Sequence, residues 1–169
     1  MLTSLLIWLE QTPPSVWVRE YPSILGFPFI LFLHTLGLAM LAAISVGIDV
    51  WVLRQQVIGR ALRMTGIIRV MWLGLGINAL SGVVLLIAYP AKALTNPVFY
   101  IKLLLVMLGV YAVQRINRAA FPGGLAATGT LTVATKRWAV VSIVTWAGTV
   151  LTGRLLAYTH HVLFAQDLL

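Results

Sequence analysis

Four long apolar stretches fill most of this 169-residue chain, at residues 24–53, 68–89, 97–114 and 138–158. A helix needs about 20 apolar residues to cross the hydrocarbon core of a bilayer. Hydrophobic residues make up 60% of the chain and charged residues 9%, whereas a soluble domain carries about 25% charged residues. The sequence therefore predicts an all-α integral membrane protein, with four transmembrane helices bundled into a single domain over residues 1–169.

Residues 1–22 precede the first span and differ from it in character. The apolar run at residues 2–10 is too short to cross a bilayer, and the Thr-Pro-Pro sequence at residues 12–14 interrupts it. Trp8 and Trp17 suit the boundary between lipid and water. We expect an N-terminal interfacial amphipathic helix at residues 2–10, lying on the membrane surface.

Basic residues are distributed unequally between the loops. Four lie within residues 54–69 and four within 115–137, whereas Arg19 and Lys92 alone lie on the opposite side of the membrane. The positive-inside rule then places the two basic loops in the cytoplasm and both termini on the opposite side, in the periplasm or at the exterior. This topology, together with anionic membrane lipids as partners, accounts for the net charge of +8, so no nucleic-acid partner is expected.

Three spans each carry one strongly polar residue, His34, Lys102 or Arg154. At the centre of a membrane helix such a residue costs roughly 2.5 kcal/mol or more, which favours a functional role. At ~1.5 Å per residue, Lys102 and Arg154 lie roughly 6–7 Å below their outer helix ends, and His34 lies roughly 12–15 Å deep. A neutral imidazole beneath two cations suits heme b, with His34 as the metal ligand and the cations on the propionates. Asn78 and Tyr158 are further candidate cofactor-binding residues.

Structural roles for the same residues remain open. His34 can instead hydrogen-bond to Asn78 or to a backbone carbonyl, and the two cations can extend to lipid phosphates. The chain has no cysteine and no second histidine within a span, so a heme would need a five-coordinate iron, a methionine ligand or a ligand from a second copy. Candidate methionines are Met40 and Met107, while His160 and His161 follow the last span.

Small and polar residues recur on single helix faces at spacings of three and four. They are His34, Gly37, Leu41, Ser45 and Asp49 on the first span, Gly74, Asn78 and Ser81 on the second, and Ser142, Thr145, Thr149 and Thr152 on the fourth. Arg154 and Tyr158 point away from this face of the fourth span, so the polar groups need not all face one cavity. Small residues allow membrane helices to approach closely, so we expect the first two spans to meet at Gly37 and Gly74/Asn78. Asp49 is expected to form a boundary salt bridge with Arg54.

Several motifs occur in order between Trp8 and Tyr158. They are WLEQTP around Glu10, the Arg19-Glu20 pair, HTLGLA from His34, Asp49, NPVFYIK ending at Lys102, and GRLLAY ending at Tyr158. Together they resemble a family of small four-helix bacterial inner-membrane proteins that is catalogued as a domain of unknown function. The resemblance implies the fold and the location. A looser architectural similarity links such bundles to copper-resistance D and cytochrome b561-like membrane proteins, although this chain lacks the paired histidines of the b561 pattern.

These observations predict a membrane subunit that binds heme b and transfers electrons near the periplasmic face. The alternative is a cofactor-free accessory or assembly subunit, whose polar residues join helices within a larger membrane complex. Either role is consistent with a homo-oligomer. No Ser/His/Asp set or metal-ligand spacing appears in the sequence, so an electron-transfer or accessory subunit is expected rather than a stand-alone enzyme.

Overall fold

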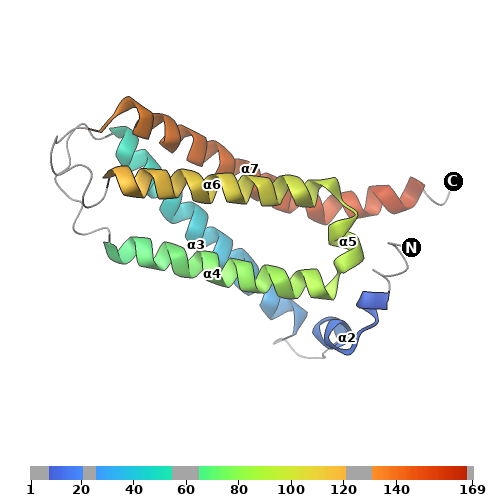
Figure 1. The fold of residues 1–169 in the computed structure, drawn as a ribbon. Helices are drawn as coiled ribbons and strands as arrows, with labels where there is room; N and C mark the ends of the chain where they lie inside the picture. Colours follow the sequence, from blue (N-terminus) through green and yellow to red (C-terminus); the bar gives the residue numbers. More distant parts are fainter. Residues whose placement is uncertain (1–7, 21–25, 55–64, 121–130, 167–169) are drawn as a thin grey trace.

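The computed structural model describes residues 8–20, 26–54, 65–120 and 131–166. This part of the chain is helical, with α2 (Pro13–Glu20), α3 (Phe27–Arg54), α4 (Thr65–Ala88), α5 (Pro90–Leu94), α6 (Pro97–Ala120) and α7 (Val133–Gln166) (Figure 1). The four long helices are α3, α4, α6 and α7, and each is long and apolar enough to cross a membrane. The predicted four-helix membrane bundle is thus confirmed, and the protein is a multi-pass membrane protein.

Two of the helices run further than the apolar stretches. The helix α6 continues to Ala120, and α7 begins at Val133 and continues to Gln166. Hydropathy marks where a chain leaves the hydrocarbon, whereas helical hydrogen bonding continues into the head-group region and water. At ~1.5 Å per residue α7 is about 51 Å long, so its C-terminal end projects past the other helices (Figure 1).

The bundle consists of two hairpins. The first pairs α3 with α4, the second pairs α6 with α7, and the hairpins pack together through α3 and α7. Leu41, Met71 and Trp146 are almost completely buried between them. Many outward-facing side chains are apolar, including Leu80 at 73% and Val144 at 64% exposure. A surface of this kind is suited to lipid contact.

The closest approach between α3 and α4 occurs at two glycines. A Cβ atom added to Gly37 would lie 2.6 Å from the backbone nitrogen of Asn78 and 2.8 Å from the carbonyl oxygen of Gly74. A Cβ atom on Gly74 would in turn lie 2.9 Å from the Cβ of Met40. The predicted contact of the first two spans at Gly37 and Gly74/Asn78 is confirmed, because the two backbones touch where neither residue has a side chain.

The N-terminal segment packs against the end of α4. A turn at Gln11 and Thr12 separates helical residues 8–10 from α2, which begins at Pro13 because proline is tolerated in a first helical turn. Ser15 Oγ donates to the carbonyl of Ile87 at 2.9 Å and so satisfies one of the free carbonyls at the end of α4. Residues 1–7 of the expected interfacial helix lie outside the described residues.

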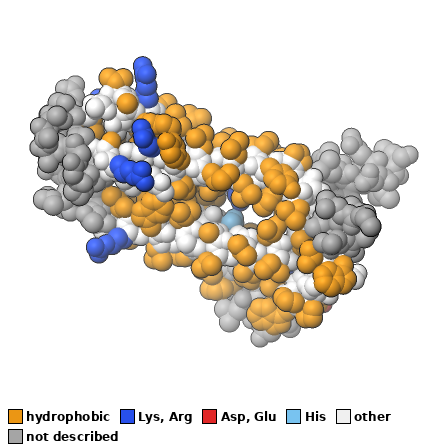
Figure 2. Space-filling view, in the orientation of Figure 1, with side chains coloured by type: hydrophobic (Ala, Val, Ile, Leu, Met, Phe, Trp, Pro, Cys, Tyr) orange, Lys and Arg blue, Asp and Glu red, His pale blue; other side chains and the backbone are white. Residues whose placement is uncertain are grey.

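Basic side chains gather at one end of the bundle, which we call the basic end (Figure 2). Its exposed members among the described residues are Arg54, Arg69, Arg115, Arg118 and Arg137. The short helices α2 and α5 lie at the opposite end, which we call the α5 end (Figure 1). The basic residues that cluster in two separate loops of the sequence are therefore at the same end of the folded bundle.

Cysteine labelling tests which end faces the cytoplasm. The chain has no native cysteine, so single cysteines can be read without background. Gly66, at the basic end, has open space around it, and Thr95, beside α5, is exposed. In intact cells we expect Thr95→Cys to react with an impermeant maleimide and Gly66→Cys to react only after the cells are opened. The reverse pattern would show that the basic end faces outward.

Candidate functional site

His34 on α3 is held by three polar groups of α4. Its Nδ1 atom lies 3.1 Å from the backbone oxygen of Asn78 and 3.2 Å from Ser81 Oγ. The side-chain amide of Asn78 donates to the carbonyl oxygen of His34 at 2.8 Å. These contacts cross the α3–α4 interface one turn beyond Gly37, where the close backbone approach brings the polar groups within reach. One structural alternative that the sequence left open, a hydrogen bond from His34 to a carbonyl, is therefore realised.

The shorter of the contacts at Nδ1 indicates the tautomer of His34. The backbone carbonyl of Asn78 only accepts, so Nδ1 carries the ring proton when it bonds to that oxygen at 3.1 Å. The other ring nitrogen, Nε2, then has a free lone pair, and Lys102 Nζ lies 3.2 Å from it. An ammonium group only donates. His34 is therefore a neutral imidazole that accepts a hydrogen bond from Lys102.

Lys102 points into the bundle from α6. Its side chain reaches His34 on α3 and also passes Gly153 on α7, where an added Cβ atom would lie 3.8 Å from Lys102 Cε. A lysine this close to a helix end ordinarily extends toward the lipid phosphates, and here it does not. No acidic side chain pairs with Lys102 in the described part of the chain; Glu10 instead accepts from the backbone of Ala91. In its ammonium form Lys102 is therefore a positive charge without an acidic partner among the described residues.

The sequence-predicted site is only partly assembled. His34, Asn78 and Lys102 are brought together, whereas Arg154 and Tyr158 are exposed on α7, with Tyr158 at 67% exposure. Depth in the membrane had suggested that Arg154 joins Lys102 above the histidine. The helical rotation of α7 instead turns Arg154 away, since its interior face is formed by Ser142, Thr145 and Thr149, which are all buried.

Sequence reasoning gave two neighbours of His34 no role in the site. Ser81 was expected to lie in the small-residue stripe of α4, and its hydroxyl contacts the imidazole directly. Gly82 lies against the ring, because a Cβ atom there would be 3.2 Å from His34 Cε1. A search for small or hydroxyl residues one turn beyond Asn78 would have identified both.

The site is accessible from the side of the bundle. His34 and Lys102 are each only partly buried, and α4 and α6 do not pack closely against one another. Figure 2 shows a histidine side chain at the surface among apolar side chains on this face of the bundle. A molecule dissolved in the bilayer can therefore reach this site laterally.

Heme ligation by His34 stays a prediction. Asn78 O accepts a hydrogen bond from Nδ1, which leaves Nε2 as the ring nitrogen that would ligate iron. Lys102 Nζ lies 3.2 Å from Nε2 and would have to move aside for a metal to bind there. Met107, one candidate second ligand, is 62% exposed.

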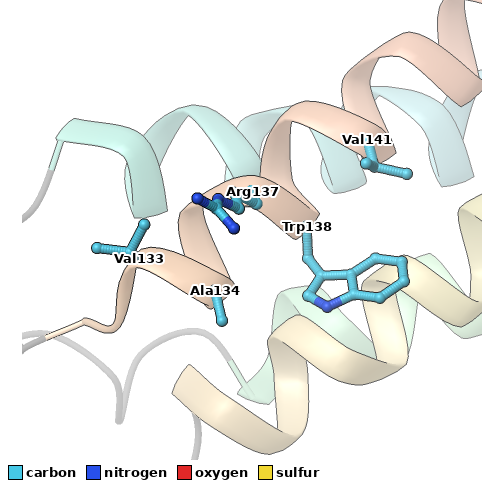
Figure 3. A pocket seen from close by; sticks show the side chains of 5 residues that line it. All are labelled: Val133, Ala134, Arg137, Trp138 and Val141. Carbon is cyan, nitrogen blue, oxygen red and sulfur yellow. The ribbon is translucent and has the colours of Figure 1, made fainter.

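Two shallow depressions lie elsewhere, at the basic end. One is lined by Val133, Ala134, Arg137, Trp138 and Val141 of α7 (Figure 3). The Trp138 ring packs edge-on against Tyr111 with ring centroids 5.3 Å apart, and Arg115 Cζ lies 6.0 Å from the same ring. Aromatic and basic side chains of this kind are typical of a membrane–water boundary. This region is therefore distinct from the site at His34.

Neither a protein-family model, nor a curated protein, nor a solved structure matches this chain.

Proposed function

We propose that this protein is a bacterial inner-membrane protein that binds an anionic amphiphile, a molecule with an oxygen-rich acidic head group and an acyl chain, at His34 and Lys102. The basic end faces the cytoplasm, so the site opens in the periplasmic half of the bilayer. The observation that carries the proposal is the inward-pointing Lys102, whose ammonium contacts His34 Nε2 at 3.2 Å and has no acidic partner among the described residues.

The charge of the site favours an anion. A buried cation without a counter-ion is costly in hydrocarbon, and an anionic ligand removes that cost. Lysine has three N–H donors, and the contact with His34 engages one of them. The remaining donors are suited to a carboxylate or phosphate oxygen through charge-assisted hydrogen bonds.

The position of the site favours a ligand that is dissolved in the membrane. Lys102 lies five residues after Pro97, the first residue of α6, which places its Cα about 7 Å below that helix end. The loose contact between α4 and α6 gives lateral access from lipid, and the outer faces of both helices are apolar, with Leu80 and Leu104 exposed. An acyl chain can follow this surface while its head group reaches Lys102.

Binding of a fluorescent fatty acid tests the proposal. Wild-type protein in nanodiscs of zwitterionic lipid is titrated with parinaric acid and, as a matched control, with its methyl ester, which has the same chain but no charge. We expect saturable binding of the acid and none of the ester. Competition by phosphatidylglycerol, but not by phosphatidylcholine, would identify a lipid phosphate as the natural head group; competition by unlabelled fatty acid alone would identify a carboxylate.

Two outcomes would overturn the proposal. Equal binding of acid and ester would show that the cation does not select the ligand. A Soret absorption band in the purified protein that disappears in His34→Ala would show that His34 ligates heme, as the sequence analysis expected, and would make the electron-transfer function correct.

A further inference from the structure

A second polar group is buried near the basic end, far from His34. Asp49 on α3 is 0% exposed, and neither of its carboxyl oxygens has a hydrogen-bond partner within the described residues. It follows His34 by fifteen positions, which corresponds to about 22 Å along the helix. Leu41 and Met71, with 1% and 0% exposure, belong to the apolar core that lies between the depth of His34 and the depth of Asp49 in the bundle.

The expected salt bridge between Asp49 and Arg54 is not formed. Arg54 is exposed at the end of α3, and the hydroxyl of Ser142 on α7 lies near the Asp49 carboxyl. Ser142 is also 0% exposed, and its hydroxyl has no hydrogen-bond partner among the described residues. Asp49 and Ser142 are thus two buried polar groups that the described part of the chain leaves unsatisfied.

Within the described residues, no cation is hydrogen-bonded to Asp49. The charged residues of α3, α4 and α7 at the basic end are Arg54, Arg69, Lys136 and Arg137, while Arg154 lies toward the other end of α7. All of them but Lys136 are exposed. An unpaired ionised carboxylate buried in a membrane protein is costly, whereas a neutral carboxylic acid carries no net charge.

We infer that Asp49, with Ser142 beside it, is a proton-binding site that exchanges with the aqueous phase at the basic end. Its carboxyl lies five residues before Arg54, the last residue of α3, which corresponds to about 7 Å along the helix. In the other direction the buried Leu41 and Met71 lie between it and His34, and Val52, on the side of the basic end, is buried as well. The inference is independent of the anion site, because the two sites lie in opposite halves of the bundle.

Infrared spectroscopy of the reconstituted protein tests this site. A protonated carboxyl has a carbonyl stretching band that a carboxylate lacks, so we expect a band that disappears reversibly as pH rises. Asp49→Asn should remove the band, Ser142→Ala should shift its frequency, and Glu20→Gln, at an exposed position on α2, should leave it unchanged. A band of Asp49 that does not respond to pH, or no such band at any pH, would contradict proton exchange.

Labelling with a hydrophobic carbodiimide shows the side from which the proton arrives, because this reagent modifies protonated carboxyls. In sealed vesicles of known orientation, raising the pH at the basic end should reduce the Asp49 adduct at least tenfold, and raising it at the α5 end should not. Dependence on the α5 end would overturn the proposed access. Binding of parinaric acid should be unchanged in Asp49→Asn, so failure at one site is distinguishable from failure at the other.

Discussion

Replacing Gly37 with alanine is expected to destabilise the bundle severely, although the substitution adds a single methyl group. The new Cβ would lie 2.6 Å from one backbone atom of α4 and 2.8 Å from another. Backbone atoms cannot rotate away as a flexible side chain can, so α3 and α4 must separate. Overpacking of this kind typically costs 1–3 kcal/mol, and here it also moves Asn78, which holds His34. We expect a clear fall in the midpoint of thermal unfolding in detergent.

A matched control for this substitution lies on α4. Gly76 is also inside a transmembrane helix, but an added Cβ would meet nothing within 4 Å. Gly76→Ala should be neutral or slightly stabilising, since alanine is favoured over glycine in a helix by about 1 kcal/mol. If Gly37→Ala unfolded at the same temperature as Gly76→Ala, the close contact between α3 and α4 would be wrong.

Replacing Lys102 with methionine is expected to abolish the selective binding of an anionic amphiphile while leaving the fold intact. Hydrogen bonds to charged groups contribute about 1.5–3 kcal/mol, which corresponds to roughly a ten- to hundredfold loss of affinity. The unpaired cation is itself costly in the bilayer, so the variant should be at least as stable to heating as wild type. Titration with parinaric acid and a thermal unfolding curve measure the two effects.

Arg154→Met is the control that distinguishes the site predicted from sequence, which includes Arg154, from the site in the structure, which does not. Both cations lie in the same half of the membrane, but Arg154 is exposed on α7, whereas Lys102 contacts His34. We therefore expect Arg154→Met to retain nearly full affinity and Lys102→Arg to retain part of it. Equal losses in Arg154→Met and Lys102→Met would mean that the cations act as a pair and that the described orientation of α7 is wrong.

The sequence by itself determined the four long helices and their interior faces, but neither of the short helices α2 and α5. The mean hydropathy of a segment of about 20 residues indicates whether that segment is stable across the hydrocarbon core. The number and approximate positions of the spans therefore follow directly from the sequence. Glycines spaced along α3 and α4 allow close approach in only one rotation of each helix, so the contact at Gly37 and Gly74 followed as well. The expected interior stripes on α3 and α7 rest on the same helical periodicity.

Only the tertiary structure decided which polar groups meet. Helical periodicity already placed Arg154 off the Ser/Thr face of the fourth span. For Lys102 the sequence gives the depth in the membrane, which leaves the direction of its long and flexible side chain open. Packing of α6 against α7 turns Lys102 inward past Gly153 and leaves Arg154 at the surface. Likewise, Asp49 lies close to Arg54 in sequence, but the α3–α7 interface buries the carboxyl while the arginine remains exposed. Contacts between distant segments depend on the relative rotation of packed helices, which no single helix encodes.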